Sequence, residues 1–304
     1  MSRVAAIDVG TNSVRLLVAD RTPDGLTEIE RDLVITRLGE GVDAARMLGE
    51  AALERTVGAI ARYRERAVEA GARTVRIGAT SAVRDAANRA DFVRAVTEAT
   101  GVRPEVLSGE EEARLSFHGA VNDLREKGPY LVLDVGGGST EFVRGRRDVD
   151  AWISLDIGSV RLTERHVRND PPTEDEVHAL AREADEAVAR AGEVVNGEGC
   201  TLVGLAGTVT TIAAISLGLE RYERSAIHHH RLRAEDLGRI SAMLARMPVE
   251  SRKELPVMPP GREDVIVAGA VILERVLSGF DFPHLIVSES DILDGLVLTI
   301  SGDA

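Results

Sequence analysis

The feature that most constrains this chain is a strand–aspartate–turn–strand pattern that occurs twice. An apolar run ending in Ile7-Asp8-Val9 is followed by the polar turn Gly10–Ser13 and a second apolar run. The pattern returns at Leu131–Asp134, where the turn Gly136–Thr140 leads into a second strand from Glu141. Two copies indicate an internal duplication. The chain is therefore expected to contain two related halves.

Composition favours alternating strands and helices over an aromatic-rich sandwich. Only 3% of the 304 residues are aromatic while 44% are hydrophobic, so the cores must be built from aliphatic side chains. Apolar spacing predicts an α/β protein. The expected strands are 4–9, 14–19, 75–79, 102–107, 131–134 and 141–143, with two more near Thr201 and Leu285, and the expected helices are 50–70, 89–100, 108–122, 173–195, 234–247 and 264–277.

A boundary between the halves is expected within residues 123–128. This gives a first domain over residues 1–124 and a second over 125–304, with the last helix able to pack back on the first domain. A ligand site is expected in a cleft between the two domains, with both glycine-bearing turns in it.

Charge and patterning exclude several classes of partner. Asp and Glu outnumber Lys and Arg by 50 to 37, a formal net charge of −13, which argues against nucleic-acid and anionic-membrane binding. The N-terminus reaches Asp8 before any signal-like apolar stretch. The uncharged segment 199–219 is expected to form a strand, a turn and a helix start, since Gly204 and Gly207 interrupt it. The single cysteine, Cys200, cannot form an internal disulfide, so a cytoplasmic location is expected.

The two turns are candidate phosphate and metal sites. Consecutive glycines let backbone N–H groups converge on a phosphate. A plain hairpin turn is the simpler explanation for one such run, but two matched turns favour binding. Carboxylates at the strand ends can hold Mg²⁺ or Mn²⁺. The candidate metal ligands are Asp8, Asp134 and Glu141, and the candidate phosphate-binding residues of the turns are Thr11, Asn12, Ser13, Gly136, Gly137, Gly138, Ser139 and Thr140.

Two further charged residues lie outside these turns. Ser108 and Glu111 form a capping-box pattern that explains the local acidity without a function. Glu112, one position further, points elsewhere on the helix and is a candidate general base. Arg84 follows a strand and suits either a phosphate clamp or a surface salt bridge. The run His228–His230 is not expected to bind a metal, because adjacent histidines cannot all face one ion.

Four segments together resemble the Ppx/GppA phosphatase family, which includes exopolyphosphatases and guanosine pentaphosphate phosphohydrolases. The resemblance spans nearly the whole chain and is carried by Asp8–Ser13, Ala79–Arg84, Ser108–Arg114 and Leu133–Glu141. It implies two ribonuclease-H-like domains of the actin, sugar-kinase and Hsp70 superfamily flanking a cleft. The segment Asp291–Gly295 departs from the usual Leu-Arg-Glu-Gly, so no substrate contact is assigned there.

Carried over residue by residue, the resemblance places the catalytic glutamate on Glu112 and the phosphate-contacting arginine on Arg84. Its metal and phosphate residues fall on Asp8, Asp134, Gly136, Gly137, Ser139 and Glu141. The family's long members have further C-terminal domains that this chain lacks, and long polyanions suit a charge of −13 poorly. The resemblance therefore implies an exopolyphosphatase that acts on short chains, with a homodimer by analogy.

Three alternatives stay open at this level. In the first, the same site hydrolyses guanosine pentaphosphate. ATP-dependent phosphoryl transfer is the second, and Glu112 with its segment argues against it. The third is a non-catalytic sensor of nucleotide or polyphosphate.

Overall fold

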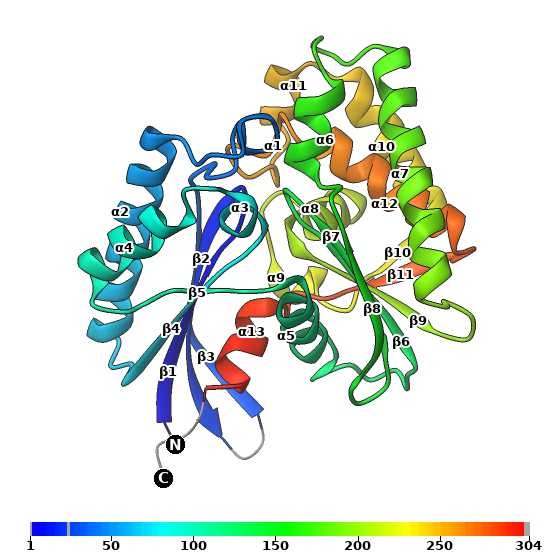
Figure 1. Ribbon diagram of the computed structural model, residues 1–304. Coiled ribbons are helices and arrows are strands. Elements are labelled where there is room, and N and C mark those ends of the chain that lie inside the picture. The colour runs from blue at the N-terminus through cyan, green and yellow to red at the C-terminus, as the bar shows by residue number, and fades with distance from the viewer. Residues whose placement is uncertain (1, 23–24, 301–304) are drawn as a thin grey trace. The chain divides into compact units, whose positions relative to one another are not determined.

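The protein forms two compact units in a computed structural model that describes residues 2–22 and 25–300 (Figure 1). Among the described residues, the first unit contains those up to Gly119 together with residues 291–300, and the second contains Ala120–Ser290. The chain thus leaves the first unit, builds the second and returns. The expected division after residue 124 differs from these units in two places. Residues 120–124 belong to the second unit, and the C-terminal segment belongs to the first.

The first unit is built on a mixed sheet of five strands. Its order is β3-β2-β1-β4-β5. The strands β1, β2 and β3 pair antiparallel, whereas β4 and β5 run parallel to β1. The bounds are β1 Ser2–Val9, β2 Ser13–Thr22, β3 Gly25–Ile35, β4 Thr74–Ala79 and β5 Glu105–Val106.

The second unit repeats this plan in a sheet of six strands, in the order β8-β7-β6-β9-β11-β10. Again the first three strands are antiparallel and the next two parallel to β6, while β10 adds an antiparallel edge. The bounds are β6 Tyr130–Val135, β7 Thr140–Gly145, β8 Val149–Leu155, β9 Thr201–Leu205, β10 Arg231–Arg233 and β11 His284–Val287. The expected fold class, two related α/β units of the ribonuclease-H-like type, is confirmed.

Helices cover both faces of the first sheet. Alternate residues of a strand point to opposite faces, so Ala5 and Ile7 belong to one apolar cluster and Val4 and Ala6 to another. The first cluster is covered by α2 and α4, and the second by α5 and α13. The bounds are α1 Val42–Ala45, α2 Glu50–Glu69, α3 Ser81–Asp85, α4 Arg89–Thr100, α5 Gly109–Val121 and α13 Ile292–Leu298.

The core of the second unit is larger and centred on α12 (Ile266–Gly279). Ten of its 14 residues are buried, as expected of a helix enclosed by neighbours on several sides. Cys200 lies half-buried at the edge of this core. The remaining helices are α6 Ser159–His166, α7 Glu174–Val194, α8 Ala206–Ser216, α9 Arg224–Ile227, α10 Ala234–Arg246 and α11 Val249–Lys253.

Several elements differ from the expectation from sequence. The edge strand β3 was not predicted, because charged side chains such as Glu28, Glu30 and Asp32 hide its strand pattern. The strand β8 and the helix α6 were also missed. The predicted strand 102–107 is reduced to the two residues of β5, and α12 begins two residues later than predicted.

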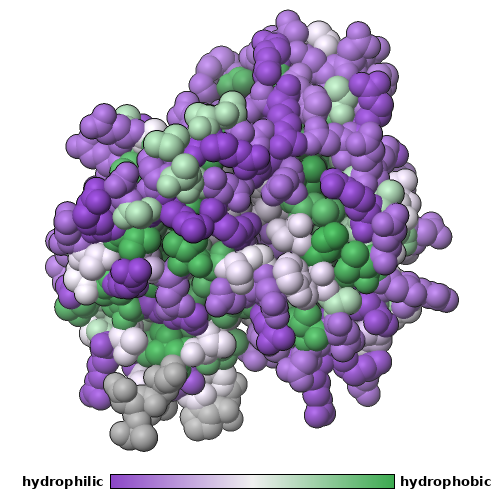
Figure 2. All heavy atoms as spheres, viewed as in Figure 1, coloured by the Kyte–Doolittle hydropathy of each residue, from purple (hydrophilic) through white to green (hydrophobic). Residues whose placement is uncertain are grey.

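The face of the molecule seen in Figure 2 is mainly polar. Figure 2 shows hydrophilic residues over most of the visible face, with apolar residues in small groups between them. Within residues 2–22 and 25–300, every helix is too short or too polar to cross a lipid bilayer.

Candidate functional site

The β1–β2 hairpin places Asp8 directly opposite Arg15. The two residues are register partners at the turn end of the hairpin. The Arg15 Nε and Nη2 groups donate to Asp8 Oδ2 at 3.0 and 2.7 Å. The turn between them is closed by the Gly10 N–H, which donates to the Ser13 carbonyl at 2.9 Å. The predicted turn therefore forms, with a buried carboxylate at its base whose charge is balanced by its own neighbour.

The second carboxylate oxygen of Asp8, Oδ1, is not used by Arg15. The residue is 2% exposed, and Oδ1 is buried with no hydrogen-bond partner among the described residues. Burial raises the pKa of Asp8 against the opposing effect of Arg15. A buried carboxylate oxygen without a donor is costly unless a cation or a proton satisfies it. The atom is thus a suitable ligand position for a hard cation.

Arg15 also connects this hairpin to the C-terminal segment. Its Nη1 group donates to Asp291 Oδ2, and Asp291 caps α13 by accepting the Leu293 N–H at 2.9 Å. Burial alone would raise the pKa of Asp291, but Arg15, Arg31 and the Leu293 N–H hold it below the usual value. The segment Asp291–Gly295, to which no substrate contact was assigned, thus has a structural role in the first unit.

The turn residues Thr11, Asn12 and Ser13 are held by backbone contacts. The Thr11 carbonyl accepts the Gly39 N–H at 2.8 Å, and the Asn12 carbonyl accepts from residues 36 and 37 at 3.0 Å. Since the N–H of a trans peptide points opposite to its C=O, the N–H groups of Asn12 and Ser13 point away from that loop. The Thr11 hydroxyl is buried and bonded to Ser81 Oγ at 2.9 Å.

Arg84 and Glu112 meet in the first unit. Arg84 Nη1 donates to Glu112 Oε2 at 2.7 Å and to the Leu107 carbonyl at 3.2 Å. Glu112 is 7% exposed, so this carboxylate lies inside the protein rather than on a solvated helix face. Arg84 therefore does form a salt bridge, one of the two roles expected for it. Its partner is Glu112, the candidate base, and the salt bridge orients the Glu112 carboxylate.

The capping box beside them is confirmed. Glu111 Oε2 accepts both the N–H and the hydroxyl of Ser108 at 2.8 Å, and the Glu111 N–H donates to Ser108 Oγ at 3.2 Å. These bonds lower the pKa of Glu111, the backbone N–H contributing most. Glu111 thus fixes the start of α5, which leaves its neighbour Glu112 to face Arg84.

The β6–β7 hairpin of the second unit places two carboxylates opposite one another. Asp134 and Glu141 are register partners, so their side chains lie on the same face of the hairpin. Both are buried, at 8% and 1% exposure. Glu141 Oε1 accepts the Ser154 hydroxyl at 2.7 Å. Like charges directly opposite are destabilising, so this pair favours a bound cation.

The glycine turn above this pair is oriented by the start of α6. The Gly136 carbonyl accepts the Ser159 N–H at 2.9 Å, the Gly137 carbonyl accepts the Val160 and Arg161 N–H groups, and the Gly138 carbonyl accepts Arg161 Nε at 2.6 Å. All three carbonyls therefore face α6. The approach is so close that a Cβ on Gly158 would lie 2.4 Å from the Gly137 oxygen.

The orientation of these three carbonyls also fixes the direction of the N–H groups of the same three peptides. Each peptide is planar and trans, so the N–H groups of Gly137, Gly138 and Ser139 point away from α6. Consecutive N–H groups turned to one side can bind an anion. The Thr140 hydroxyl does not point with these N–H groups. It donates to the Ile157 carbonyl at 2.8 Å and so fixes the turn against the segment between β8 and α6.

The donor sets of both hairpins fit a divalent metal ion. Asp8 offers a buried oxygen without a donor, and Asp134 with Glu141 offers two buried carboxylates on one face. Such all-oxygen sets match Mg²⁺ and Mn²⁺.

A second group of possible ligands consists of Asp123, His228 and His229, whose ligand atoms lie within 4.8 Å of one another. His228 Nδ1 accepts the Glu289 N–H at 3.0 Å, so a neutral ring must carry its proton on Nε2. That Nε2 lies 3.0 Å from Asp123 Oδ2, as expected of a donor to the carboxylate. A metal on His228 Nε2 would displace that proton and break this arrangement, so we assign no metal to the group.

Sequence reasoning missed three polar residues that shape the two hairpins: Arg15, Ser154 and Arg161. Arg15 could have been found, because it follows Asp8 at the same spacing at which Glu141 follows Asp134. Ser154 and Arg161 lie on β8 and α6, which were not predicted as elements. The segment 154–164 that contains them also resembles the Ppx/GppA family, and this was the signal that could have led to them.

The fold and the hairpins together define a class of protein. Two ribonuclease-H-like units with matched aspartate–glycine turns, one of them above a pair of carboxylates, are suited to handling phosphoryl groups with a metal ion.

The comparisons with known proteins identify the family. The model of the Ppx/GppA phosphatase family matches residues 17–302, and the chain belongs to that family. It is 43% identical to exopolyphosphatase 2 of Mycobacterium tuberculosis over 99% of both chains. Among solved structures, it resembles an exopolyphosphatase-like protein at 38% identity and a TM-score of 0.93, covering 98% of both chains. The Ppx/GppA protein of Aquifex aeolicus follows at 33% identity and a TM-score of 0.83, covering 98% of this chain and 97% of the other.

Family membership makes the chain a phosphoanhydride hydrolase.

Proposed function

We propose that this enzyme is an exopolyphosphatase that releases terminal orthophosphate from short chains of inorganic polyphosphate. The observation that carries the proposal is the buried pair Asp134 and Glu141 below three N–H groups turned to one side. The name of the mycobacterial relative, exopolyphosphatase 2, supports the choice of substrate. The net charge of −13 favours short chains over long polyanions.

The ligands of the metal ion, Mg²⁺ or Mn²⁺, would be Asp8, Asp134 and Glu141. When bound, the ion supplies positive charge that stabilises the phosphoryl oxygens. Phosphoryl transfer depends mainly on positioning and charge, so the backbone N–H groups would bind the same oxygens without needing to reorganise. Those assigned are Gly137, Gly138 and Ser139 of the second unit and Asn12 and Ser13 of the first.

Glu112 is the proposed general base. It would orient a water molecule and accept its proton as the water attacks the terminal phosphorus. The bond to Arg84 fixes the carboxylate in one rotamer, and that arginine would also contact the phosphate. The water oxygen forms the new bond, and the phosphoanhydride oxygen leaves with the shortened chain.

The test is phosphate release with Mg²⁺ or Mn²⁺ from tripolyphosphate, long polyphosphate, guanosine pentaphosphate and ATP in parallel. Glu112→Gln is expected to lose about 10²–10⁴-fold in kcat while still binding the substrate, because it keeps the shape and loses the base. Glu110→Gln is the matched control, since Glu110 is exposed on the same helix.

Each outcome is decisive. Faster release from guanosine pentaphosphate would make that nucleotide the substrate. Tight binding without release from any compound would indicate a sensor, and transfer to an added acceptor would indicate a kinase. Unchanged kcat in Glu112→Gln would remove the residue from its role.

A cytoplasmic location, a homodimer and the absence of nucleic-acid and membrane partners complete the proposal. They rest on the sequence and on the resemblance to relatives.

A further inference from the structure

A groove on the first unit is lined by more arginines than carboxylates. It has a volume of about 860 Å³ and lies between α4, β5 and the start of α5. Four arginines line the part beside α4, namely Arg84, Arg89, Arg94 and Arg103, against the two carboxylates of Glu98 and Glu111. We call this part the arginine groove. It is notable in a chain whose acidic residues outnumber its basic ones.

The arginine groove begins at a residue of the proposed site. Arg84 lines it and also donates to Glu112. An anion that contacts Arg84 at the catalytic glutamate can therefore continue along the surface of the same unit toward Arg89 and Arg103.

Two of the four guanidinium groups are available for a ligand. Among residues 2–22 and 25–300, no side-chain hydrogen bond or ion pair is found for Arg89 or Arg103. Arg94 donates to Asp91 at 2.8 Å, but both side chains are largely exposed, and such a pair contributes little. Of the opposing carboxylates, Glu111 is already engaged by Ser108.

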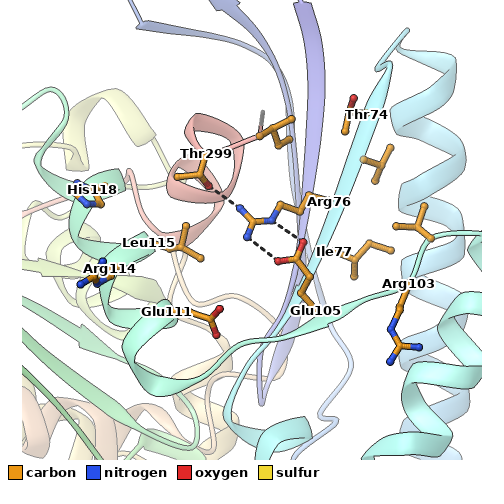
Figure 3. A pocket seen from close by; sticks show the side chains of 13 residues that line it. Thr74, Arg76, Ile77, Arg103, Glu105, Glu111, Arg114, Leu115, His118 and Thr299 are labelled. Atoms are coloured by element: carbon orange, nitrogen blue, oxygen red, sulfur yellow. Dashed lines mark hydrogen bonds and ion pairs between the residues drawn. The ribbon is translucent and has the colours of Figure 1, made fainter. Parts of the chain in front are cut away.

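The neighbouring hollow provides a contrast. It shares Arg103 and Glu111 with the arginine groove, and Figure 3 shows the Arg103 guanidinium turned away from the other basic groups there. Arg76 in that hollow donates two bonds to Glu105 and a third to Thr299. Arg114 forms an ion pair with Glu110 at 3.4 Å. Arg76 and Arg114 of the hollow are thus bound to protein groups, whereas no such partner is found among the described residues for Arg89 and Arg103.

The lining also indicates the chemistry of the ligand. Guanidinium groups bind phosphate oxygens through paired N–H donors. No aromatic side chain lines the arginine groove among the described residues, so a nucleoside base would find no ring to stack on. We infer that the arginine groove binds the distal phosphates of a linear polyphosphate whose terminal phosphate lies at Glu112. This inference rests on the proposed function and adds a second contact region for chains longer than the shortest substrates.

The test compares two chain lengths in one double variant, Arg89→Ser with Arg103→Ser. The values of kcat and KM for tripolyphosphate should stay within about twofold of the wild type, because the terminal contacts are untouched. The KM for long polyphosphate should rise about three- to tenfold, as expected for losing two exposed charge contacts. The matched control is Arg182→Ser with Arg190→Ser, two exposed arginines of α7 that line another surface hollow.

A second measurement separates this inference from the proposed function. Direct binding of long polyphosphate is measured for the wild type and both double variants. If the wild type hydrolyses no polyphosphate, the proposed function fails. A weaker Kd in the groove variant alone would then still support the arginine groove. Equal Kd values in all three proteins, or a KM that rises equally for both chain lengths, would overturn it.

Discussion

The two hairpins share a backbone and differ in how they balance a buried aspartate. Both turns are closed by a glycine N–H that donates to the serine carbonyl three residues later, at 2.9 and 3.0 Å. Opposite the aspartate stands Arg15 in the first unit and Glu141 in the second. One hairpin is thus neutralised by its own chain, whereas the other concentrates negative charge.

This difference shows how duplicated units acquire separate tasks. In the first unit, Arg15 holds Asp8 and Asp291 together, so the pair stabilises the fold and leaves one oxygen of Asp8 for a ligand. In the second unit, two carboxylates stand directly opposite one another, and a bound cation would reduce the repulsion between them. The residue opposite the aspartate, Arg15 or Glu141, thus separates a structural ion pair from the proposed metal site.

The largest expected effect is that of Glu141→Gln. The amide keeps the bond to Ser154 but removes one charge from the pair. Activity should fall about 10²- to 10³-fold, as when a group that stabilises the transition state is lost. The affinity for Mn²⁺ should fall with it, which calorimetric titration would measure. Ser154→Ala is the milder control.

The stability of the same variant tests whether the two hairpins really differ in this way. Without divalent ions, Glu141→Gln should be at least as stable as the wild type, because it relieves repulsion between like charges. A large loss of stability in metal-free buffer would show that Glu141 has a structural role like that of Arg15.

Arg15→Met is expected to lower the stability of the protein, in contrast to Glu141→Gln. It leaves two buried carboxylates without their shared cation, and removing one partner of a buried ion pair costs about 3–5 kcal/mol. Urea unfolding would measure this loss. Arg3→Met is the control, since Arg3 and Asp20 are partly exposed and solvent weakens their ion pair, so its loss should destabilise the protein much less. Equal effects of the two substitutions would contradict the distinction.

The smallest effect concerns pH. The pKa of Asp291 is held below 3.8, so its contribution to stability is complete above that value and is lost as the pH falls through the lower, folded-state pKa. Asp291→Asn keeps a good N-cap and removes the charge. At neutral pH it should cost about 1–2 kcal/mol, as for a hydrogen bond to a charged group. The difference from the wild type should shrink below pH 4 in urea unfolding, and a constant difference would refute the assignment.

The sequence predicted the parts of the site that depend on local pattern. Both turns, the strand ends at Asp8 and Asp134, and the capping box of Ser108 and Glu111 follow from short stretches of chain. These features are fixed by backbone conformation within a few residues.

What the sequence did not predict depends on pairing between distant segments. The bond from Arg84 to Glu112 joins α3 to α5, and the carbonyls of the glycine turn are oriented by α6, which was missed. The edge strand β3 was hidden because its outward side chains are charged. Register and packing fix such contacts, and neither is visible in residue type alone.

The return of the chain to the first unit has a consequence for its synthesis. The helix α13 supplies Ile292, Leu293, Leu296 and Val297 to the second apolar face of the first sheet, and Asp291 to Arg15. Because these residues follow the second unit in the chain, they are synthesised after it. During synthesis, Asp8 and Arg15 therefore meet Asp291 only after the second unit has been made.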